Sequence, residues 1–219
     1  MPNALVWDEA GKKMYEAGVS KGVLYPIQTE GAYSLGVAWN GLTSVSQNPT
    51  GGEANDIYAD NIVYGSLMGT EKFEATIEAY MYPDEFMECD GSKTLQPGVY
   101  AGQQNRKTFG LCYRTEIGND VDGLEKGYKL HMIYGAKASP AGRDYATIND
   151  SPEAITLSWD LTTTPVAVTG MKPTAYVEID STKADPDKLA ALEAILYGST
   201  EAEARLPLPD EIKTLMATP

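Results

Sequence analysis

The amino-acid sequence predicts a mainly β protein, an antiparallel β-sandwich or barrel with one flanking α-helix and a short C-terminal helix. Three observations lead to this fold class. Apolar and polar residues alternate with period two through most of the chain, as in strands with one buried face. The 219 residues include 21 Gly and 13 Pro, which favour many turns. Only two segments, both near the C-terminus, have the spacing of an amphipathic helix.

Seven or more half-buried strands are expected from the alternation. In KFEATIEAY, residues 72–80, the side chains at 73, 75, 77 and 79 are apolar, while Glu74, Thr76 and Glu78 are polar and face the other way. The expected strands are residues 23–29, 34–46, 72–80, 108–116, 127–135, 154–162 and 174–180. So many short strands of this kind are typical of an antiparallel sandwich or barrel.

The sequence marks one helix clearly and a second, shorter one. Asp185 is a suitable N-cap, Pro186 suits the first helical position, and Gly198 ends the helix. Its buried stripe is Leu189, Leu192, Ile195 and Leu196. The second helix is expected in PDEIKTLMA, residues 209–217. Between the two, residues 199–209 carry charge and proline, which predicts an extended arm leading to a docking helix.

No linker divides the chain, so residues 1–219 are expected to form a single domain with three projecting parts. These are an N-terminal segment of about 1–22, an extended loop of about 44–56 and a C-terminal arm of about 199–219. The loop follows a strand anchored by Trp39 and contains almost no apolar residue after Val45. Its candidate contact residues are Ser44, Gln47, Asn48, Pro49, Gly51 and Gly52.

Charge argues against direct binding to nucleic acid. The chain has 31 acidic and 17 basic residues and a formal net charge of −14, whereas nucleic-acid binding needs a cationic surface. The charges are also segregated: residues 53–90 hold ten acids and one base, and residues 93–143 hold eight bases and four acids. Such blocks could meet between subunits, or could simply be solvated loops of different composition. Neither a secretory signal nor a membrane-spanning stretch is expected.

No motif predicts an enzyme, a cofactor or a metal site. GVSKG, residues 18–22, matches a serine-hydrolase elbow, but no helix is expected after Ser20. His131, the only histidine, is expected to be exposed or to face a partner. Cys89 and Cys112 are expected to be free, partly buried thiols, with a disulfide as the alternative. DEFMECDG, residues 84–91, lacks the ligand spacing of a calcium loop. A glycosidase carboxylate pair stays open, because no spacing singles out two acids.

Four phrases carry a resemblance to a known family. They are GVSKGVLYP (18–26), GVAWNGLTSV (36–45), NDIYADNIVYGSLMGTEKFEATIEAYMYPDEFMECDG (55–91) and ARLPLPDEI (204–212). In this order and spacing they resemble the major tail protein, or tail tube protein, of bacteriophages with long non-contractile tails. The similar group occurs in phages and prophages of Gram-positive bacteria. Residues 93–150 carry little of the resemblance.

The resemblance implies a phage tail tube-like fold and a structural role in the virion, after synthesis in the host cytoplasm. Subunits of this family form hexameric rings that stack into a hollow tube. Phage DNA passes through the lumen without specific binding. Family members have no enzymatic activity or cofactor, and they contact the tape measure protein and the tail terminator and tip proteins. No membrane is involved.

Two sets of residues acquire candidate roles from this resemblance. Glu74 and Glu78 are candidates for the lumen wall, because a cationic wall would retain DNA. The loop of about 44–56 is a candidate for contacts between rings, ordered on a neighbouring subunit. The alternative function is a carbohydrate-binding β-sandwich on a virion or cell surface, in which some of the 14 Tyr and 3 Trp would stack on sugars.

Overall fold

The computed structural model describes residues 4–28, 31–33, 35–140, 142–148, 150 and 153–217. Residues 1–3, 29, 34 and 218–219 belong to segments expected from the sequence and lie outside the described residues. The strands are β1 (Tyr15–Pro26), β2 (Val37–Trp39), β3 (Leu42–Gln47), β4 (Ala54–Ala59), β5 (Ile62–Met68), β6 (Glu74–Ala79), β7 (Lys93–Gln96), β8 (Val99–Ala101), β9 (Phe109–Asn119), β10 (Gly123–Ala138), β11 (Leu157–Thr163) and β12 (Tyr176–Asp180). The helices are η1 (Asp84–Phe86), α1 (Met87–Asp90), α2 (Pro186–Tyr197) and α3 (Pro209–Met216).

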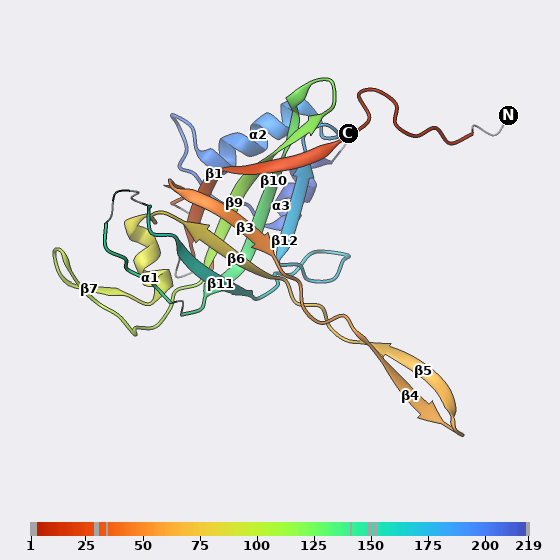
Figure 1. The fold of residues 1–219 in the computed structure, drawn as a ribbon, viewed down its shortest axis with the longest axis horizontal. Helices are drawn as coiled ribbons and strands as arrows, with labels where there is room; N and C mark the ends of the chain where they lie inside the picture. The colour runs from red at the N-terminus through yellow and green to blue at the C-terminus, as the bar shows by residue number, and fades with distance from the viewer. Residues whose placement is uncertain are drawn as a thin grey trace.

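Eight strands form one antiparallel sheet that does not close into a barrel. Their order is β2-β1-β9-β10-β11-β6-β3, with β12 paired to β10 beside this path (Figure 1). The long strand β10 connects two parts of the sheet, because Lys129–Ile133 pair with β12 whereas Ala136–Ala138 pair with β11. The mainly β, antiparallel fold class is therefore confirmed.

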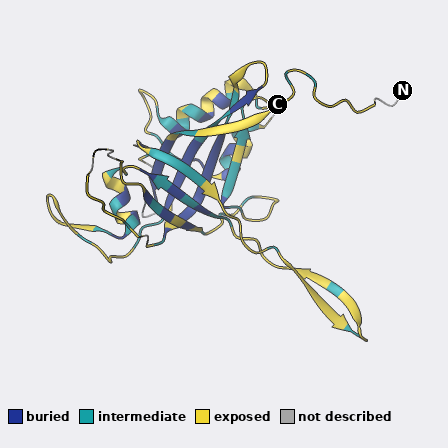
Figure 2. Ribbon diagram, viewed as in Figure 1, coloured by how far each residue is buried: buried dark blue, intermediate teal, exposed yellow. Residues whose placement is uncertain are grey.

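Two clusters of buried side chains divide the fold into three layers. The first cluster joins β6 and β11 to one face of β9 and β10, with Ile77, Trp159 and Leu111 at zero or near-zero exposure (Figure 2). The second joins the other face of β9 and β10 to the helices, through Met132 and Leu192. This division follows from the alternation of successive side chains across a strand.

Helix α2 forms where the sequence predicts it. The Asp185 carboxylate accepts hydrogen bonds from the backbone N–H groups of Asp187 and Lys188, at 3.0 and 3.2 Å, and so caps the helix. Helix α3 is also present as expected. No helix in the described part of the chain is long and apolar enough to cross a membrane.

The segment between α2 and α3 differs from the expected extended arm. Leu206 is buried, and its N–H donates to the carbonyl of Tyr33 at 2.9 Å. The N–H of Arg205 donates to the carbonyl of Ile195 at 2.9 Å. Residues 199–203 are exposed, whereas residues 204–209 pack against the body and contribute Leu206 to the core.

The projecting part of the chain is longer than the expected loop of 44–56, and it contains two strands. Ser44 and Gln47 lie in β3, which pairs with β6. Outside the sheet, β4 and β5 pair with each other as a hairpin that extends away from the body (Figure 1). At its tip, Asp60 and Asn61 both have positive φ, as a two-residue type I′ turn requires.

Gly135 lies at the bend where β10 changes its pairing partner. Its φ is +60°, and a Cβ there would lie 2.2 Å from the carbonyl oxygen of Thr164. We therefore expect Gly135→Ala to lower the free energy of unfolding by about 2 kcal/mol or more. Gly102→Ala is the matched control, because its Cβ would meet nothing within 4 Å. Urea unfolding of both variants measures the difference, and equal stabilities would contradict this account of the bend.

Candidate functional site

The β4–β5 hairpin exposes apolar side chains on both of its faces. Tyr58 is 70 % exposed, Tyr64 73 % and Met68 72 %. The other exposed large apolar residues of the hairpin are Ile57, Ile62, Val63 and Leu67. An isolated two-stranded hairpin is marginally stable in water. The hairpin therefore presents exposed apolar side chains away from the buried core of the domain.

A short two-stranded stem connects this hairpin to the sheet. The N–H of Thr50 donates to the carbonyl of Lys72 at 2.9 Å, and the N–H of Lys72 donates back at 2.7 Å. Gly51 has φ +80°, and a Cβ there would lie 2.4 Å from the Thr70 carbonyl oxygen, so the stem requires glycine at this position. Pro49 and Gly52 belong to the same stem.

The other candidate loop residues are held by the sheet. The Ser44 hydroxyl donates to Glu78 Oε2 at 2.9 Å, and the Gln47 side-chain amide donates to the Tyr113 hydroxyl at 2.8 Å. The Asn48 amide donates to Thr76 Oγ1 at 3.2 Å. These three residues therefore fix the point at which the stem leaves the body.

Trp39 is a core residue at the end of β2. Its indole N–H donates to the carbonyl of Met81 at 2.9 Å, and its ring packs 4.6 Å from the ring of Phe86, centre to centre. Because a turn and the whole of β3 follow it, Trp39 anchors the β2–β3 connection, and the stem begins eight or more residues later.

The outer face of β3, β6 and β11 carries a continuous row of polar side chains. Residues paired directly across antiparallel strands share a face. The pairing joins Ser44 to Glu78 to Ser158, Ser46 to Thr76 to Asp160, and Glu74 to Thr162. This set of eight, the acidic face, contains the three carboxylates Glu74, Glu78 and Asp160 and no base; Lys137 lies at its border, opposite Thr162.

Asp160 is a member of this face that sequence reasoning missed. Thr76 donates a hydrogen bond to its carboxylate at 2.7 Å. The alternation in residues 154–162 does place Asp160 on a polar face, but nothing in the sequence pairs β11 with β6. On the opposite face of β6, Ala75, Ile77 and Ala79 are buried, which fixes the outward direction of Glu74 and Glu78.

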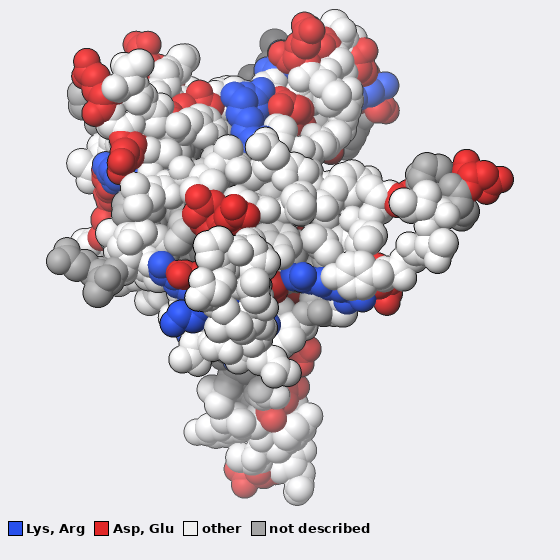
Figure 3. All heavy atoms as spheres, turned by 90° about the vertical axis from the view of Figure 1, so that its left-hand side faces the viewer, with Lys and Arg blue, Asp and Glu red and all other residues white. Residues whose placement is uncertain are grey.

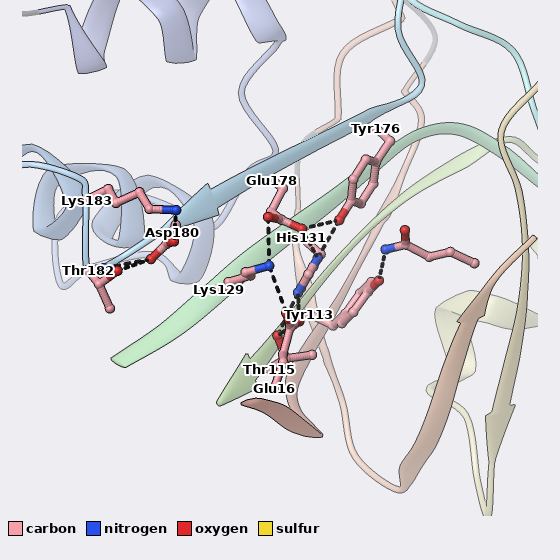
Figure 4. A network of polar contacts seen from close by, with 11 residues as sticks. Glu16, Tyr113, Thr115, Lys129, His131, Tyr176, Glu178, Asp180, Thr182 and Lys183 are labelled. Carbon is pink, nitrogen blue, oxygen red and sulfur yellow. Dashed lines mark hydrogen bonds and ion pairs between the residues drawn. The ribbon is translucent and has the colours of Figure 1, made fainter. Parts of the chain in front are cut away.

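His131 is buried in a polar network, so the expectation of an exposed or partner-facing histidine is wrong. The network joins β1, β9, β10 and β12 (Figure 4). His131 Nε2 lies 2.8 Å from Thr115 Oγ1, and Nδ1 lies 2.6 Å from the Tyr176 hydroxyl. Lys129 Nζ bridges Glu16 at 2.8 Å and Glu178 at 3.0 Å. These contacts tie the start of β1 to β12 across the middle of the sheet.

Hydroxyl groups and carboxylates surround both ring nitrogens of His131. Thr115 donates its proton to Glu16 at 2.6 Å, so its oxygen is an acceptor for Nε2. The Tyr176 hydroxyl, which lies 2.6 Å from Nδ1, donates to Glu178 Oε2 at 3.0 Å. Burial lowers the pKa of His131 below its ordinary value of 6.5, against the opposing effect of the Glu178 and Glu16 carboxylates. Burial alone would raise the pKa of Glu16, but hydrogen bonds from Lys129 and Thr115 hold it below its usual value.

This network predicts a loss of stability in mild acid. The unfolded chain binds a proton at His131 more readily than the folded chain, so His131 favours folding above about pH 6.5 and disfavours it as the pH falls through the folded pKa. We expect the free energy of unfolding to fall as the pH is lowered from about 6.5, and to fall less steeply in His131→Gln. Urea unfolding of both proteins across this range is the measurement, and parallel pH profiles would contradict the assignment.

The structure places the remaining sequence candidates away from any catalytic or metal-binding arrangement. Ser20 lies within β1, between two irregularities in its pairing with β9, instead of on a turn between a strand and a helix. Cys89 and Cys112 are free and buried, as expected, and burial raises the pKa of each thiol to about 12. In the described ranges, no group of three or more His, Cys, Asp or Glu side chains could hold a metal ion.

The acids of the first charge block, residues 53–90, are spread over several elements. They lie on the stem and hairpin, on β6 and around α1. On the face that Figure 3 shows, acidic and basic side chains form small groups with uncharged surface between them. On this face, the charges are therefore distributed in local groups.

Comparison with known proteins gives a likeness of structure and no match of sequence family. No protein family matches the chain. No curated protein matches it either. Among solved structures, it is similar to a chain in the cryo-EM structure of the anti-feeding prophage (AFP) baseplate, 6-fold symmetrised, with a TM-score of 0.38 and 7% sequence identity. The similarity covers 82% of this chain and 99% of that chain.

Proposed function

We propose that the protein is a structural subunit of a phage tail that assembles with copies of itself into stacked rings, hexamers by the family resemblance, around a channel for DNA. The observation that carries the proposal is the β4–β5 hairpin. Seven large apolar side chains of this hairpin are exposed. Neither the hairpin nor its stem contributes to the two buried clusters. Such a displayed surface is typical of a chain that completes its packing on a second chain.

The energy available from the hairpin is sufficient for assembly. Burying a large apolar side chain contributes about 1.5–3 kcal/mol, so burial of the seven would contribute on the order of 10 kcal/mol before the costs of association. The hairpin has two apolar faces, which suits insertion between elements of a neighbouring subunit. A contact of this kind joins two different surfaces, and repeated around and along an axis it generates rings and filaments.

The acidic face supports the assignment of the channel. Glu74, Glu78 and Asp160 lie side by side on strands whose other face is buried, so they form an outward wall of one sign. A wall of carboxylates repels the DNA backbone and keeps it hydrated, whereas a basic wall would bind it through counterion release. In the proposed tube this face lines the lumen, and tape measure, terminator and tip proteins contact the tube at its interior and ends.

Sedimentation velocity over a wide concentration range tests the proposed function. We expect species of several subunits that grow with concentration, because each subunit displays a contact surface that its own fold leaves uncovered. The carbohydrate-binding alternative predicts a monomer whose sedimentation coefficient does not change with protein concentration. A monomer at the highest soluble concentration would contradict the proposed function.

A further inference from the structure

A second hairpin, formed by β7 and β8, borders a basic groove. The groove has a volume of about 370 Å³ and is lined by Glu88, Ser92, Lys93, Gln104, Asn105, Arg106 and Lys107. Lys107 pairs with Glu88 at 3.2 Å, and Arg106 donates to the carbonyl of Ala138 at 2.8 Å. Lys93 makes no ion pair with any residue that the structure describes. The groove therefore has three cationic groups and one carboxylate.

The β7–β8 hairpin adds apolar surface at the same place. Leu95 is 63 % exposed, and Val99 and Tyr100 are about half exposed. The two strands are joined at Pro97 and Gly98, with Gly98 at φ +78°, as a type II turn requires. This surface combines exposed apolar side chains with neighbouring positive charge.

The β4–β5 hairpin and its stem have the complementary composition. Their carboxylates are Glu53, Asp56, Asp60 and Glu71, and their only base is Lys72. Within the described ranges, these four carboxylates make no ion pair. Exposed apolar residues lie between them, as they do on the β7–β8 hairpin. Opposite charges around an apolar centre give an interface its specificity and its register.

The two hairpins lie toward opposite ends of the long axis of the molecule (Figure 1). A subunit therefore cannot join its own two surfaces, and two subunits that joined through one pair of surfaces would each retain a free surface of the other kind. This head-to-tail arrangement is the one that extends into a ring or a filament instead of stopping at a dimer.

We propose that the β4–β5 hairpin of one subunit docks on the β7–β8 hairpin and the adjoining basic groove of the next subunit. The occupant of the groove is thus a second copy of this chain, and the inference rests on the proposed function. The acidic residues of the arriving hairpin meet Lys93 and Lys107, and its tyrosines pack on Leu95 and Tyr100. Residues 93–107 then act as the receiving surface for the projecting arm.

Cross-linking between two variants that each carry one added, exposed cysteine tests the docking directly. Tyr64→Cys in one sample and Leu95→Cys in the other are mixed, assembled and treated with a short bismaleimide. The native cysteines stay unmodified, because both are fully buried and burial raises the pKa of each thiol to about 12. We expect mixed dimers on a denaturing gel, severalfold above a control pair of Tyr64→Cys with Lys172→Cys, an exposed position outside both surfaces.

Charge reversal provides a second, independent readout. Lys93→Glu with Lys107→Glu should raise the concentration needed for assembly by about tenfold or more, and Glu53→Lys with Asp56→Lys on the hairpin should partly restore it. Cross-links no more frequent than in the control pair, or a charge-swapped combination no better than the single reversals, would overturn the docking site. If rings or tubes still form in those samples, the proposed function survives; if the parent chain forms no assembly at all, both fail.

Discussion

Excision of the β4–β5 hairpin is expected to give a folded subunit that no longer assembles. Thr50 and Lys72 are paired, so residues 51–71 can be replaced by Asn-Gly, which closes the pair as a two-residue turn. None of the excised residues is buried. We expect the melting temperature to change by no more than about 2 °C, while ring stacking is abolished.

The matched control for this excision is Asn61→Gly. Asn61 has φ +64° at the tip of the hairpin, a conformation that glycine adopts freely, and the substitution leaves every exposed apolar and acidic side chain in place. It should assemble like the parent. Thermal unfolding and electron microscopy of both variants give the result. Normal tubes from the shortened chain would refute the role of the hairpin, and a large drop in melting temperature would place it in the folding core.

Reversing the charge of the acidic face is expected to make assembled tubes retain DNA. Lysine at positions 74, 78 and 160 changes the charge by two units at each position and turns a repelling wall into one that binds phosphates through counterion release. The substitutions leave the fold intact because these side chains face outward from β6 and β11. Short double-stranded DNA should remain with the pelleted tubes at low salt and leave them as salt is raised.

A control with the same change of charge separates the position of the lysines from their number. Asp144→Lys, Glu153→Lys and Glu201→Lys replace three exposed acids outside the acidic face. Tubes of this control should retain less DNA in their interior than tubes with lysines on the acidic face, as measured by protection from a nuclease. Equal protection in the two triple variants would show that the acidic face does not line the lumen.

The sequence predicts the parts of this fold that depend on local physics. Period-two alternation identifies the strands of the main sheet, and the Asp185 cap, Pro186 and Gly198 give the bounds of α2 within a residue or two. The turn signal Asp60–Asn61 was present, but the flanking residues 54–68 are apolar on both faces, and the expected alternation of a half-buried strand is absent there. The sequence therefore does not predict this hairpin as an element.

Features that depend on distant pairing could not be obtained from one sequence. Asp160 joins Glu74 and Glu78 only because β11 pairs with β6, and His131 is buried only because β12 brings Tyr176 and Glu178 against it. Leu206 is in the core because Tyr33, far away in the sequence, accepts its N–H. In each case the residue type was visible, and its partner was determined by the tertiary fold.

Electron microscopy of the concentrated, purified parent protein tests the central claim, self-assembly into a tube, most directly. The account predicts stacked rings with a central channel, which grow in number with protein concentration and are absent when residues 51–71 are excised. Single particles of monomer size at every concentration, with binding of the same protein to an oligosaccharide array, would contradict it.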